Sequence, residues 1–479
     1  MKTMHRIVVA PGDGVGPEIT DATLRILRAA ETPVEWDTIQ LGQTVFESGN
    51  SSGVPHEAWD LIRKSGVLLK GPVTTPQGKG FKSVNVTIRK ALNLFANVRP
   101  CKAYAPCVAS PHPGMNLVII RENEEDLYAG IEHRQTPEVY QVLKLVTRPG
   151  CEKIIRYAFE YARAYGRRKV SCMTKDNIMK LTDGLFHQVF DEVATEYPDI
   201  IANHFIIDIG AARLAASPEI FEVIVTLNLY GDILSDIAAQ IAGSIGFASS
   251  ANVGQHVSMF EAVHGSAPDI AGKGIVNPSG FLIAATQMLV HMGLAEHAET
   301  IQNAWLCALE DGIHTLDIYR ESLSTRVVGT DDFASAVIER LGKRPAILAP
   351  VAYQAKKIQV SYTPHPVDKR LVGVDIFLDW DDAGRDATVL GRRLAAVATA
   401  ELPLTLITNR GVKVYPEGLP ETFCTDHWRC RFKSEAENVP YQTVLDLMQR
   451  ISSAGLDIIK TENLCTFDGM PGYSVGQGE

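Results

Sequence analysis

Short apolar runs alternate with helical patterns over residues 6–342. The run at residues 6–10 leads through a glycine-rich turn into residues 16–30, where apolar positions recur with the spacing of a helix. Residues 66–73 are another apolar run of strand length, and residues 150–169 form an amphipathic pattern with a basic end. This alternation of strands and helices predicts an α/β fold.

A second region follows a proline- and alanine-rich stretch, residues 343–360, which has no strong period and is interpreted as a linker. From residue 361 to residue 479 the pattern gives the order β-α-β-β-β-α-β. This order is typical of a ferredoxin-like α+β domain. The length of 479 residues suits about three domains in all.

The composition is that of a globular protein, with 46% hydrophobic and 21% charged residues. No run of 18 apolar residues occurs, and the first apolar segment is too short for a signal peptide. A formal net charge of −10 argues against a nucleic-acid partner. The eight cysteines are widely spaced, as expected for reduced thiols, so we expect a cytoplasmic protein without a membrane partner.

Two acidic residues, Asp232 and Asp236, follow an apolar run that ends near residue 227. The pattern from residue 233 onward is helical, so both side chains should project from one face of its first turn. Such a pair suits a hard divalent cation such as Mg²⁺, which prefers oxygen ligands. It also suits two solvated acids that stabilise a helix N-terminus. Spacing alone leaves both interpretations open.

Further residues with side chains that can bind a substrate or take part in catalysis lie close together in short stretches of the sequence. They are Ser83, Asn85, Arg89 and Arg99; Arg121 and Tyr128; Lys175 to Asn177; and Asp208. Guanidinium groups bind carboxylates through two parallel hydrogen bonds, so several arginines suit a substrate with several carboxylates. Lys175 follows a predicted strand, where a general acid or base can be held.

The segments PGDGVGPE, ANVRP, RENEEDLYAGIE, KDNIMK, NLYGDILSD and HGSAPDIAGKGIVNP occur in this order. Together they resemble the β-decarboxylating dehydrogenases, the family of isocitrate, 3-isopropylmalate and homoisocitrate dehydrogenases. The resemblance implies the two-domain isopropylmalate/isocitrate dehydrogenase-like fold with a clasp. The implied parts are a large domain (1–94 and 243–342), a small domain (95–126 and 148–242) and a clasp-like arm (127–147).

Ser83 and Asn85 before Arg89 resemble the isocitrate form of the substrate loop, so isocitrate is the expected substrate. The resemblance implies a substrate site formed by Ser83, Asn85, Arg89, Arg99, Arg121 and Asn177, and a Mg²⁺ or Mn²⁺ site formed by Asp208, Asp232 and Asp236. Lys175 would take the hydroxyl proton, and Tyr128 would protonate the enolate after CO₂ leaves. Lys175 and Asp208 would come from a neighbouring subunit, which implies at least a homodimer.

The resemblance also places the cofactor against residues 264–277, with Thr75, His264, Gly265, Asp269, Ile270 and Asn277 in its site. NADP-using relatives resemble one another in carrying Lys and Tyr where this chain has Asp269 and Ile270. A carboxylate can accept a hydrogen bond from a free ribose 2′-hydroxyl, and it repels a 2′-phosphate. We therefore expect NAD as the cofactor.

Several alternatives stay open. Homoisocitrate or 3-isopropylmalate could replace isocitrate as the substrate. A silent regulatory subunit of a hetero-oligomer is disfavoured, because such a subunit would be expected to lose Lys175, Tyr128 or the metal aspartates. The C-terminal domain suits either oligomerisation or effector binding. A phosphate on Ser83 would repel substrate carboxylates, but the sequence does not show whether a kinase acts there.

Overall fold

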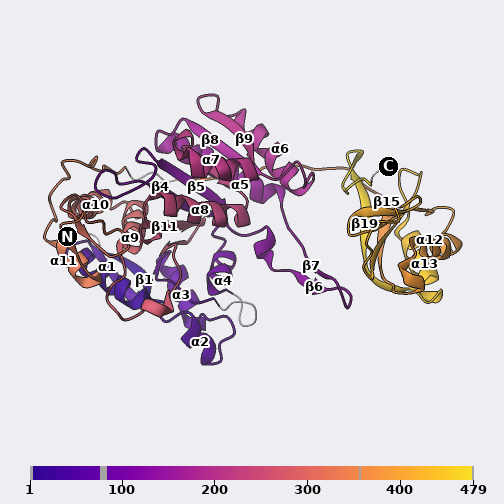
Figure 1. Ribbon diagram of the computed structural model, residues 1–479, viewed down its shortest axis with the longest axis horizontal. Helices are drawn as coiled ribbons and strands as arrows, with labels where there is room; N and C mark the ends of the chain where they lie inside the picture. Colours follow the sequence, from indigo (N-terminus) through magenta and orange to yellow (C-terminus); the bar gives the residue numbers. More distant parts are fainter. Residues whose placement is uncertain (1–3, 76–82, 355–357, 477–479) are drawn as a thin grey trace. The chain divides into compact units, whose positions relative to one another are not determined.

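The computed structural model describes residues 4–75, 83–354 and 358–476, which form two compact units (Figure 1). The first unit comprises residues 1–128 and 145–362, and the second comprises residues 129–144 and 363–479. The predicted linker, residues 343–360, belongs to the first unit, and its residues 355–357 lie outside the described part. Val351, Tyr353 and Ile358 pack against the core of that unit, so this segment is not a free tether.

The sheet of the first unit is built from β1 His5–Ala10, β2 Val34–Thr38, β3 Val67–Lys70, β4 Ala96–Lys102, β5 Asn116–Glu122, β8 Lys169–Thr174, β9 Ile201–Ile206, β10 Val223–Thr226, β11 Ser249–Val253 and β12 Ser258–Ala262. Among the described residues these strands form one sheet in the order β2-β1-β3-β12-β11-β4-β5-β10-β8-β9. Pairing is parallel towards both ends and antiparallel from β12 through β11 and β4 to β5. The mixed α/β fold predicted from the alternating pattern is confirmed.

The helices of the first unit are α1 Gly16–Ala29, α2 Gln43–Glu47, α3 His56–Ser65, α4 Val84–Ala91, α5 Arg148–Ala164, α6 Thr182–Ala194, α7 Ile207–Ala216, α8 Asn228–Ala242, α9 Ser279–His291, α10 Ala295–Glu310 and α11 Thr330–Ile338. Alternate residues of one strand belong to different core clusters. Ile7 and Val9 of β1 lie in one cluster, whereas Val8 lies in another. Both faces of the sheet are therefore covered, which explains why its strands read as continuous apolar runs. A short parallel pair, β13 Ile313–His314 and β14 Arg326–Val327, lies outside this sheet.

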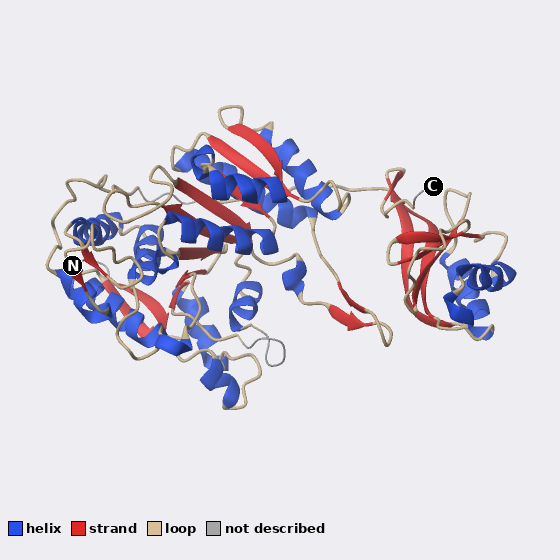
Figure 2. Cartoon of the chain, viewed as in Figure 1, coloured by secondary structure: helices blue, strands red, loops and turns tan. Residues whose placement is uncertain are grey.

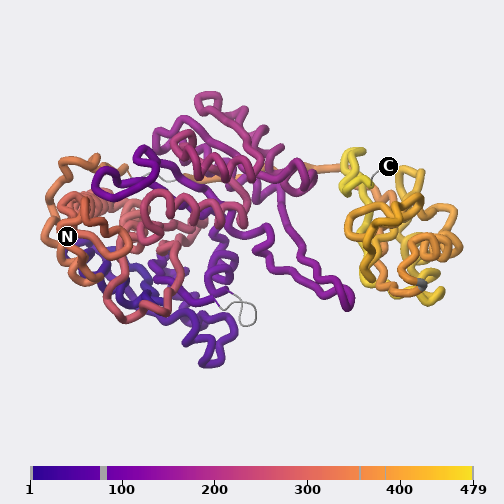
Figure 3. Tube along the Cα trace, viewed as in Figure 1, coloured from indigo at the N-terminus to yellow at the C-terminus, as the bar shows by residue number. Residues whose placement is uncertain are grey.

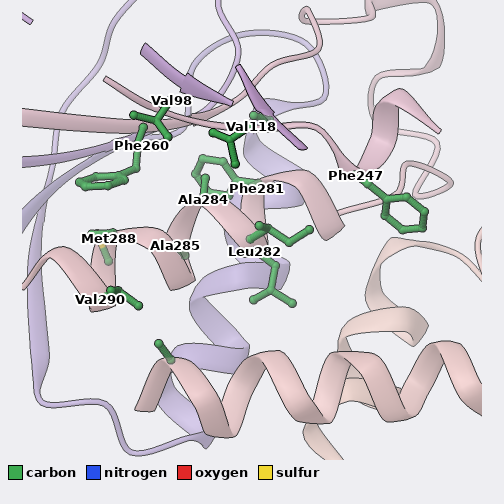
Figure 4. Packing of buried hydrophobic residues seen from close by; sticks show 14 of the residues in the cluster. Val98, Val118, Phe247, Phe260, Phe281, Leu282, Ala284, Ala285, Met288 and Val290 are labelled. Atoms are coloured by element: carbon green, nitrogen blue, oxygen red, sulfur yellow. The ribbon is translucent and has the colours of Figure 1, made fainter. Parts of the chain in front are cut away.

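Helix α9 lies at the centre of the largest core cluster. Phe281, Ala284 and Met288 of this helix are fully buried, and Figure 4 shows them with Val98 and Phe260 of the neighbouring strands. A helix that is apolar on all sides is buried on all sides. This helix therefore joins the sheet to α10 and α11 within one core.

The second unit contains a separate antiparallel sheet with two helices (Figure 2). Its elements are β15 Lys369–Asp379, α12 Ala387–Val397, β16 Leu404–Asn409, β17 Val412–Tyr415, β18 His427–Lys433, α13 Tyr441–Ser453, β19 Asp457–Phe467 and β20 Met470–Pro471. Among the described residues the strand order is β17-β16-β18-β15-β19-β20, and every neighbouring pair is antiparallel. The separate C-terminal α+β domain predicted from the sequence is confirmed.

Residues 129–144 form an arm that belongs to the second unit. The arm is a hairpin of β6 Glu132–Arg134 and β7 Tyr140–Val142, which Figure 3 traces as a narrow loop. Among the described residues, no helix is long and apolar enough to cross a membrane. All eight cysteines lie in the described part, and each is a free thiol.

Candidate active site

Asp232 and Asp236 lie on α8, which follows strand β10 almost directly. The helix begins at Asn228, about one turn before residue 233, where the helical pattern of the sequence begins. The backbone N–H of Leu229 donates to Asp126 Oδ2 at 2.8 Å, which satisfies one of the free N–H groups of the first turn. The two acids therefore lie in the second and third turns, where the effect of the helix N-terminus has faded. This position removes the interpretation that they stabilise the start of a helix.

The Asp232 carboxylate is surrounded by donors. Arg121 Nη1 and Arg99 Nη1 both bond Asp232 Oδ1, the latter at 3.3 Å, and the Tyr128 hydroxyl donates to Oδ2 at 2.5 Å. Burial raises the pKa of Asp232, but the two guanidinium groups outweigh it and hold the pKa below its usual value. Asp232 is therefore an anion at neutral pH.

Arg121 is the most firmly fixed of the predicted substrate arginines, with 1% of its surface exposed. Its Nε and Nη2 donate to Asn228 Oδ1 at 3.0 and 2.7 Å, and its Cζ lies 4.9 Å from the centroid of the Tyr128 ring. Burial lowers the pKa of Arg121 to about 10, so it stays cationic at neutral pH. A Cβ at Gly231 would lie 2.6 Å from Arg121 Cγ, so a glycine is required there.

Arg99 and Arg89 are also buried and held by side chains. Arg99 Nε donates to Asn97 at 2.7 Å and its Nη1 to Ser235 at 2.5 Å. Arg89 Nη2 pairs with Glu261 Oε1 at 2.8 Å. The three predicted arginines thus come from a helix and two neighbouring strands, and only the fold brings their fixed charges together.

Glu261 is a buried anion with 3% exposure. Its Oε2 lies 2.8 Å from Lys70 Nζ, and its Oε1 accepts from Arg89 and from Asn252 Nδ2. Burial raises the pKa of Glu261, but the charges of Lys70 and Arg89 lower it by more than burial raises it. The pKa of Glu261 therefore lies well below its usual value. Neither Glu261 nor Lys70 was among the predicted site residues, because each belongs to an apolar strand in the sequence.

The predicted substrate loop lies at the start of α4. Ser83 is the residue before this helix, and its Oγ accepts from Thr75 Oγ1 at 3.2 Å. Asn85 Oδ1 is buried and has no hydrogen-bond partner among the described residues. An unpaired buried acceptor is costly, so Asn85 offers a place for a ligand donor. Thr75, predicted as a cofactor residue, therefore lies beside the predicted substrate residue Ser83.

Lys175 and Asp208 form a pair of their own. Lys175 Nζ lies 2.8 Å from Asp208 Oδ1, and Lys175 N donates to Asp183 Oδ2 at 2.6 Å. The hydrogen bond from Lys175 lowers the pKa of Asp208. Asn177, two residues on, is exposed.

Within one chain, the described residues bring only one set of three metal-type side chains within 4.8 Å of one another, and this set includes none of Asp208, Asp232 and Asp236. The prediction that a neighbouring subunit supplies Asp208 stays a prediction.

The set that does meet is Asp176, His187 and His204. His187 Nδ1 lies 2.6 Å from Asp176 Oδ2, whereas His204 Nε2 lies 2.8 Å from Thr174 Oγ1. The two imidazole rings are stacked, with centroids 3.6 Å apart and planes 16° apart. A metal ion lies in the plane of each ligating ring, and stacked rings do not provide that arrangement. The group therefore supports the segment after β8, which carries Lys175.

The predicted cofactor residues occupy the loop after β12. Asn277 is buried, and its Nδ2 donates to Asp317 Oδ2 at 3.0 Å. Burial lowers the pKa of His264, and its Nε2 has no partner among the described residues. Gly265 and Asp269 are exposed, and Asp269 and Ile270 lie in a 3-10 turn, Pro268–Ile270.

Residues outside the predicted set bring this loop to Thr75. Thr74 Oγ1 lies 2.9 Å from Ser266 Oγ, and Thr74 N donates to Asp13 Oδ2 at 2.8 Å. Val15 N donates to Ser266 O at 2.8 Å, which joins the first glycine-rich turn to the same loop. The segment PGDGVGPE signalled this turn, but its contact with residues 264–277 depends on the fold.

The family follows from comparison with known proteins. The model of the isocitrate/isopropylmalate dehydrogenase family matches residues 6–337. The chain belongs to the isocitrate/isopropylmalate dehydrogenase family. A second model, the C-terminal domain of bacterial isocitrate dehydrogenase, matches residues 369–479. This member of the family therefore combines the dehydrogenase fold with the bacterial C-terminal domain.

Two relatives extend over the whole chain. An isocitrate dehydrogenase [NADP] of Rickettsia bellii is 51% identical over 479 residues and covers 99% of each chain. An isocitrate dehydrogenase [NADP] of Thermus thermophilus is 45% identical over 482 residues, with 99% of this chain and 96% of the relative covered. A crystal structure of a protein from Thermus thermophilus is similar to this family member with a TM-score of 0.92 at 45% identity, covering 99% and 96% of the two chains.

The prediction of NAD is wrong, because these full-length relatives are named for NADP. It treated Asp269 and Ile270 as decisive. Lys273 lies in the same loop, and a 2′-phosphate can be bound by any cation that the fold brings to the ribose. Two positions of an exposed loop therefore do not decide between the cofactors.

Proposed function

We propose that this protein catalyses the oxidative decarboxylation of isocitrate to 2-oxoglutarate and CO₂ with NADP as hydride acceptor. The observation that carries the proposal is the group of three buried arginines. Arg99 and Arg121 bond Asp232 together with Tyr128. Arg89 is held by Glu261, and its charge also lowers the pKa of Asp232. A tricarboxylate needs several fixed cations, and the full-length relatives are named isocitrate dehydrogenase [NADP].

The arginines would bind the substrate carboxylates. Asn228, Asn97 and Glu261 each hold one guanidinium group, so binding requires little loss of side-chain entropy. Ser83 and Asn85 would add a hydroxyl and an unpaired acceptor, and Asn177 would complete the site from its own segment.

Asp232 and Asp236, with Asp208 from a second subunit, would hold Mg²⁺ or Mn²⁺. The set suits such an ion because all its donors are carboxylate oxygens and because Asp232 is ionised. The bound ion would supply Lewis-acid stabilisation of negative charge at the substrate oxygen.

Two residues would move protons. Lys175, as the neutral amine, would accept the proton of the substrate hydroxyl and become an ammonium group, and its Nζ lies 2.8 Å from Asp208, a carboxylate assigned to the same site. Tyr128 would donate a proton to the carbon from which CO₂ departs. Burial raises the pKa of Tyr128, which keeps the hydroxyl protonated until it is needed.

The loop with His264, Gly265, Asp269, Ile270 and Asn277 would bind the cofactor together with Thr75. When bound, NADP would accept the hydride from the substrate. Because Lys175 and Asp208 would serve a neighbouring site, we propose a homodimer at least. The division into a large domain, a small domain and a clasp-like arm, and a cytoplasmic location, belong to the same proposal.

The test is steady-state turnover of the full-length protein with Mg²⁺. Isocitrate, homoisocitrate and 3-isopropylmalate would each be assayed with NADP and with NAD, and kcat/KM compared. We expect the highest value for isocitrate with NADP. A higher kcat/KM for either other acid would overturn the substrate, and a higher value with NAD would overturn the cofactor.

A further inference from the structure

The arm, residues 129–144, has little to hold it by itself. All its residues are described, and Thr136, with 5% exposure, is the one that is buried. Its two strands are three residues each, and an isolated two-stranded hairpin is marginally stable in water. The contacts at its tip therefore decide how firmly the arm is held.

One such contact joins Thr136 to the C-terminal domain, within the second unit. Thr136 Oγ1 donates to Asp426 Oδ1 at 2.6 Å, and Asp426 is 2% exposed. The Asp426 carbonyl accepts from Trp380 N at 2.9 Å, which fixes this residue to the end of β15. A buried carboxylate needs its donors, so losing the Thr136 hydroxyl would be costly.

A second contact joins Glu138 to Arg385. The two guanidinium Nη atoms donate to the two carboxylate oxygens at 3.0 and 2.9 Å, which is the bidentate arrangement. Arg385 Nε also bonds Asp381, and its Nη1 bonds the Cys424 carbonyl. Arg385 has a φ of +61°, a conformation that costs energy for any residue with a side chain. The backbone thus bears strain at the residue that holds the arm.

Both ends of the arm attach beside Tyr128. Tyr128 lies in a 3-10 turn, Leu127–Ala129, which leads directly into the arm. At the other end, Leu145 O accepts from Asp126 N at 2.8 Å. The arm is therefore continuous in the chain with Tyr128, the residue whose hydroxyl bonds Asp232.

The contacts of Thr136 with Asp426 and of Glu138 with Arg385 are here named the arm latch. We propose that the arm latch lets the C-terminal domain position Tyr128, so that this domain serves the reaction without contributing a catalytic group. The inference rests on the role proposed for Tyr128. It assigns to the domain a task other than effector binding.

The first experiment measures hydrogen exchange of the arm amides in the full-length protein. Thr136→Val keeps the shape and removes the hydroxyl, and should speed exchange in β6 and β7 about ten-fold. Glu138→Gln removes one partner of a half-exposed ion pair and should speed it about two- to five-fold. Arg370→Gln is the matched control, because Arg370 forms its ion pairs with Asp368 and Glu437 of the same domain, which lie outside the arm in the sequence.

The second experiment measures kcat and KM for isocitrate. Thr136→Val should lower kcat about ten-fold and leave KM within about two-fold, because the substrate arginines are held by other elements. In a Tyr128→Phe background the same change should have no further effect on kcat, since Tyr128 is then already lost. A merely structural role for the latch would lower kcat equally in both backgrounds.

Unchanged arm exchange in Thr136→Val would overturn the latch. Faster exchange with unchanged kcat, or an equal fall of kcat in the Tyr128→Phe background, would overturn the positioning of Tyr128. If the native protein does not turn over isocitrate, the proposed function and the role of Tyr128 both fall, while the exchange data still decide whether the latch holds the arm.

Discussion

Replacement of Glu261 by glutamine should destabilise the first unit and weaken substrate binding together. Among the described residues, Glu261 is the anion that pairs with Lys70, whose side chain has no exposed surface, and it also pairs with Arg89. Glutamine keeps the size and removes the charge. Lys70 is then left as a buried cation without an anion, and Arg89 loses the group that fixes its guanidinium.

The magnitude follows from the burial of the pair. Breaking one partner of a buried ion pair costs about 3–5 kcal/mol. At an unfolding entropy of about 2.1 cal/mol/K per residue, a unit of roughly 350 residues changes its Tm by about 1.4 °C for each kcal/mol, so we expect a fall of roughly 4–7 °C. Thermal unfolding would be followed by near-ultraviolet circular dichroism, and KM for isocitrate should rise about ten-fold.

Two further variants decide the reason for the effect. Glu261→Gln combined with Lys70→Met removes both the buried anion and the cation it neutralises, and should recover at least half of the lost Tm. Asp331→Asn, which breaks an exposed pair with Arg25 in the same unit, should change Tm by less than about 1 °C. If Glu261→Gln leaves Tm unchanged, or if adding Lys70→Met lowers Tm further, the reasoning from an uncompensated buried charge is refuted.

The remaining predictions concern the reaction, the metal and pH. Tyr128→Phe should lower kcat about 10²- to 10⁴-fold with little change in KM for isocitrate, because it removes the proposed proton donor and leaves the arginines in place. Asp236→Asn should raise the Mg²⁺ concentration needed for half-maximal activity at least about ten-fold, and a chelator should abolish turnover of the native protein. Burial raises the pKa of Glu122 to about 8 from an ordinary 4.5. Between these two pH values the folded protein keeps a proton on Glu122 that the unfolded chain has lost. Stability from this group is full below about pH 4.5 and is lost as pH approaches 8, so Glu122→Gln should raise Tm increasingly from pH 5 to pH 8.

Each of these has a result that contradicts it. Normal kcat in Tyr128→Phe would remove this residue from the chemistry, and an unchanged Mg²⁺ requirement in Asp236→Asn would remove it from the metal site. A constant difference in Tm between Glu122→Gln and the native protein across this pH range would mean that Glu122 is ionised in the fold. The exposed Glu57→Gln serves as the control for the pH series.

The order of apolar runs and helical patterns determined the class of fold. Runs such as residues 6–10 read as buried strands because both faces of the sheet are covered, and the β-α-β-β-β-α-β order of the C-terminal region carries over directly into an antiparallel sheet with two helices. Local motifs also identify Arg89, Arg99, Arg121, Tyr128 and Asp232 as candidate site residues from the sequence alone. The start of α8 was missed because the side chain that caps its first turn, Asp126, lies far away in the sequence.

The partners of those residues were decided by tertiary structure alone. Glu261 and Lys70 read as single charges within apolar strands, and only the parallel pairing of β12 with β3 sets them side by side against Arg89. Thr136 and Asp426 are 290 residues apart, and nothing in either segment signals that they meet. The prediction of NAD is wrong for the same reason. Binding of a ribose phosphate depends on all the charges that the fold places around it, and not only on two positions of one loop. The pattern of apolar and polar residues along the chain indicates whether each residue is buried. It does not indicate which residues, distant in the sequence, lie next to a buried charge and neutralise it.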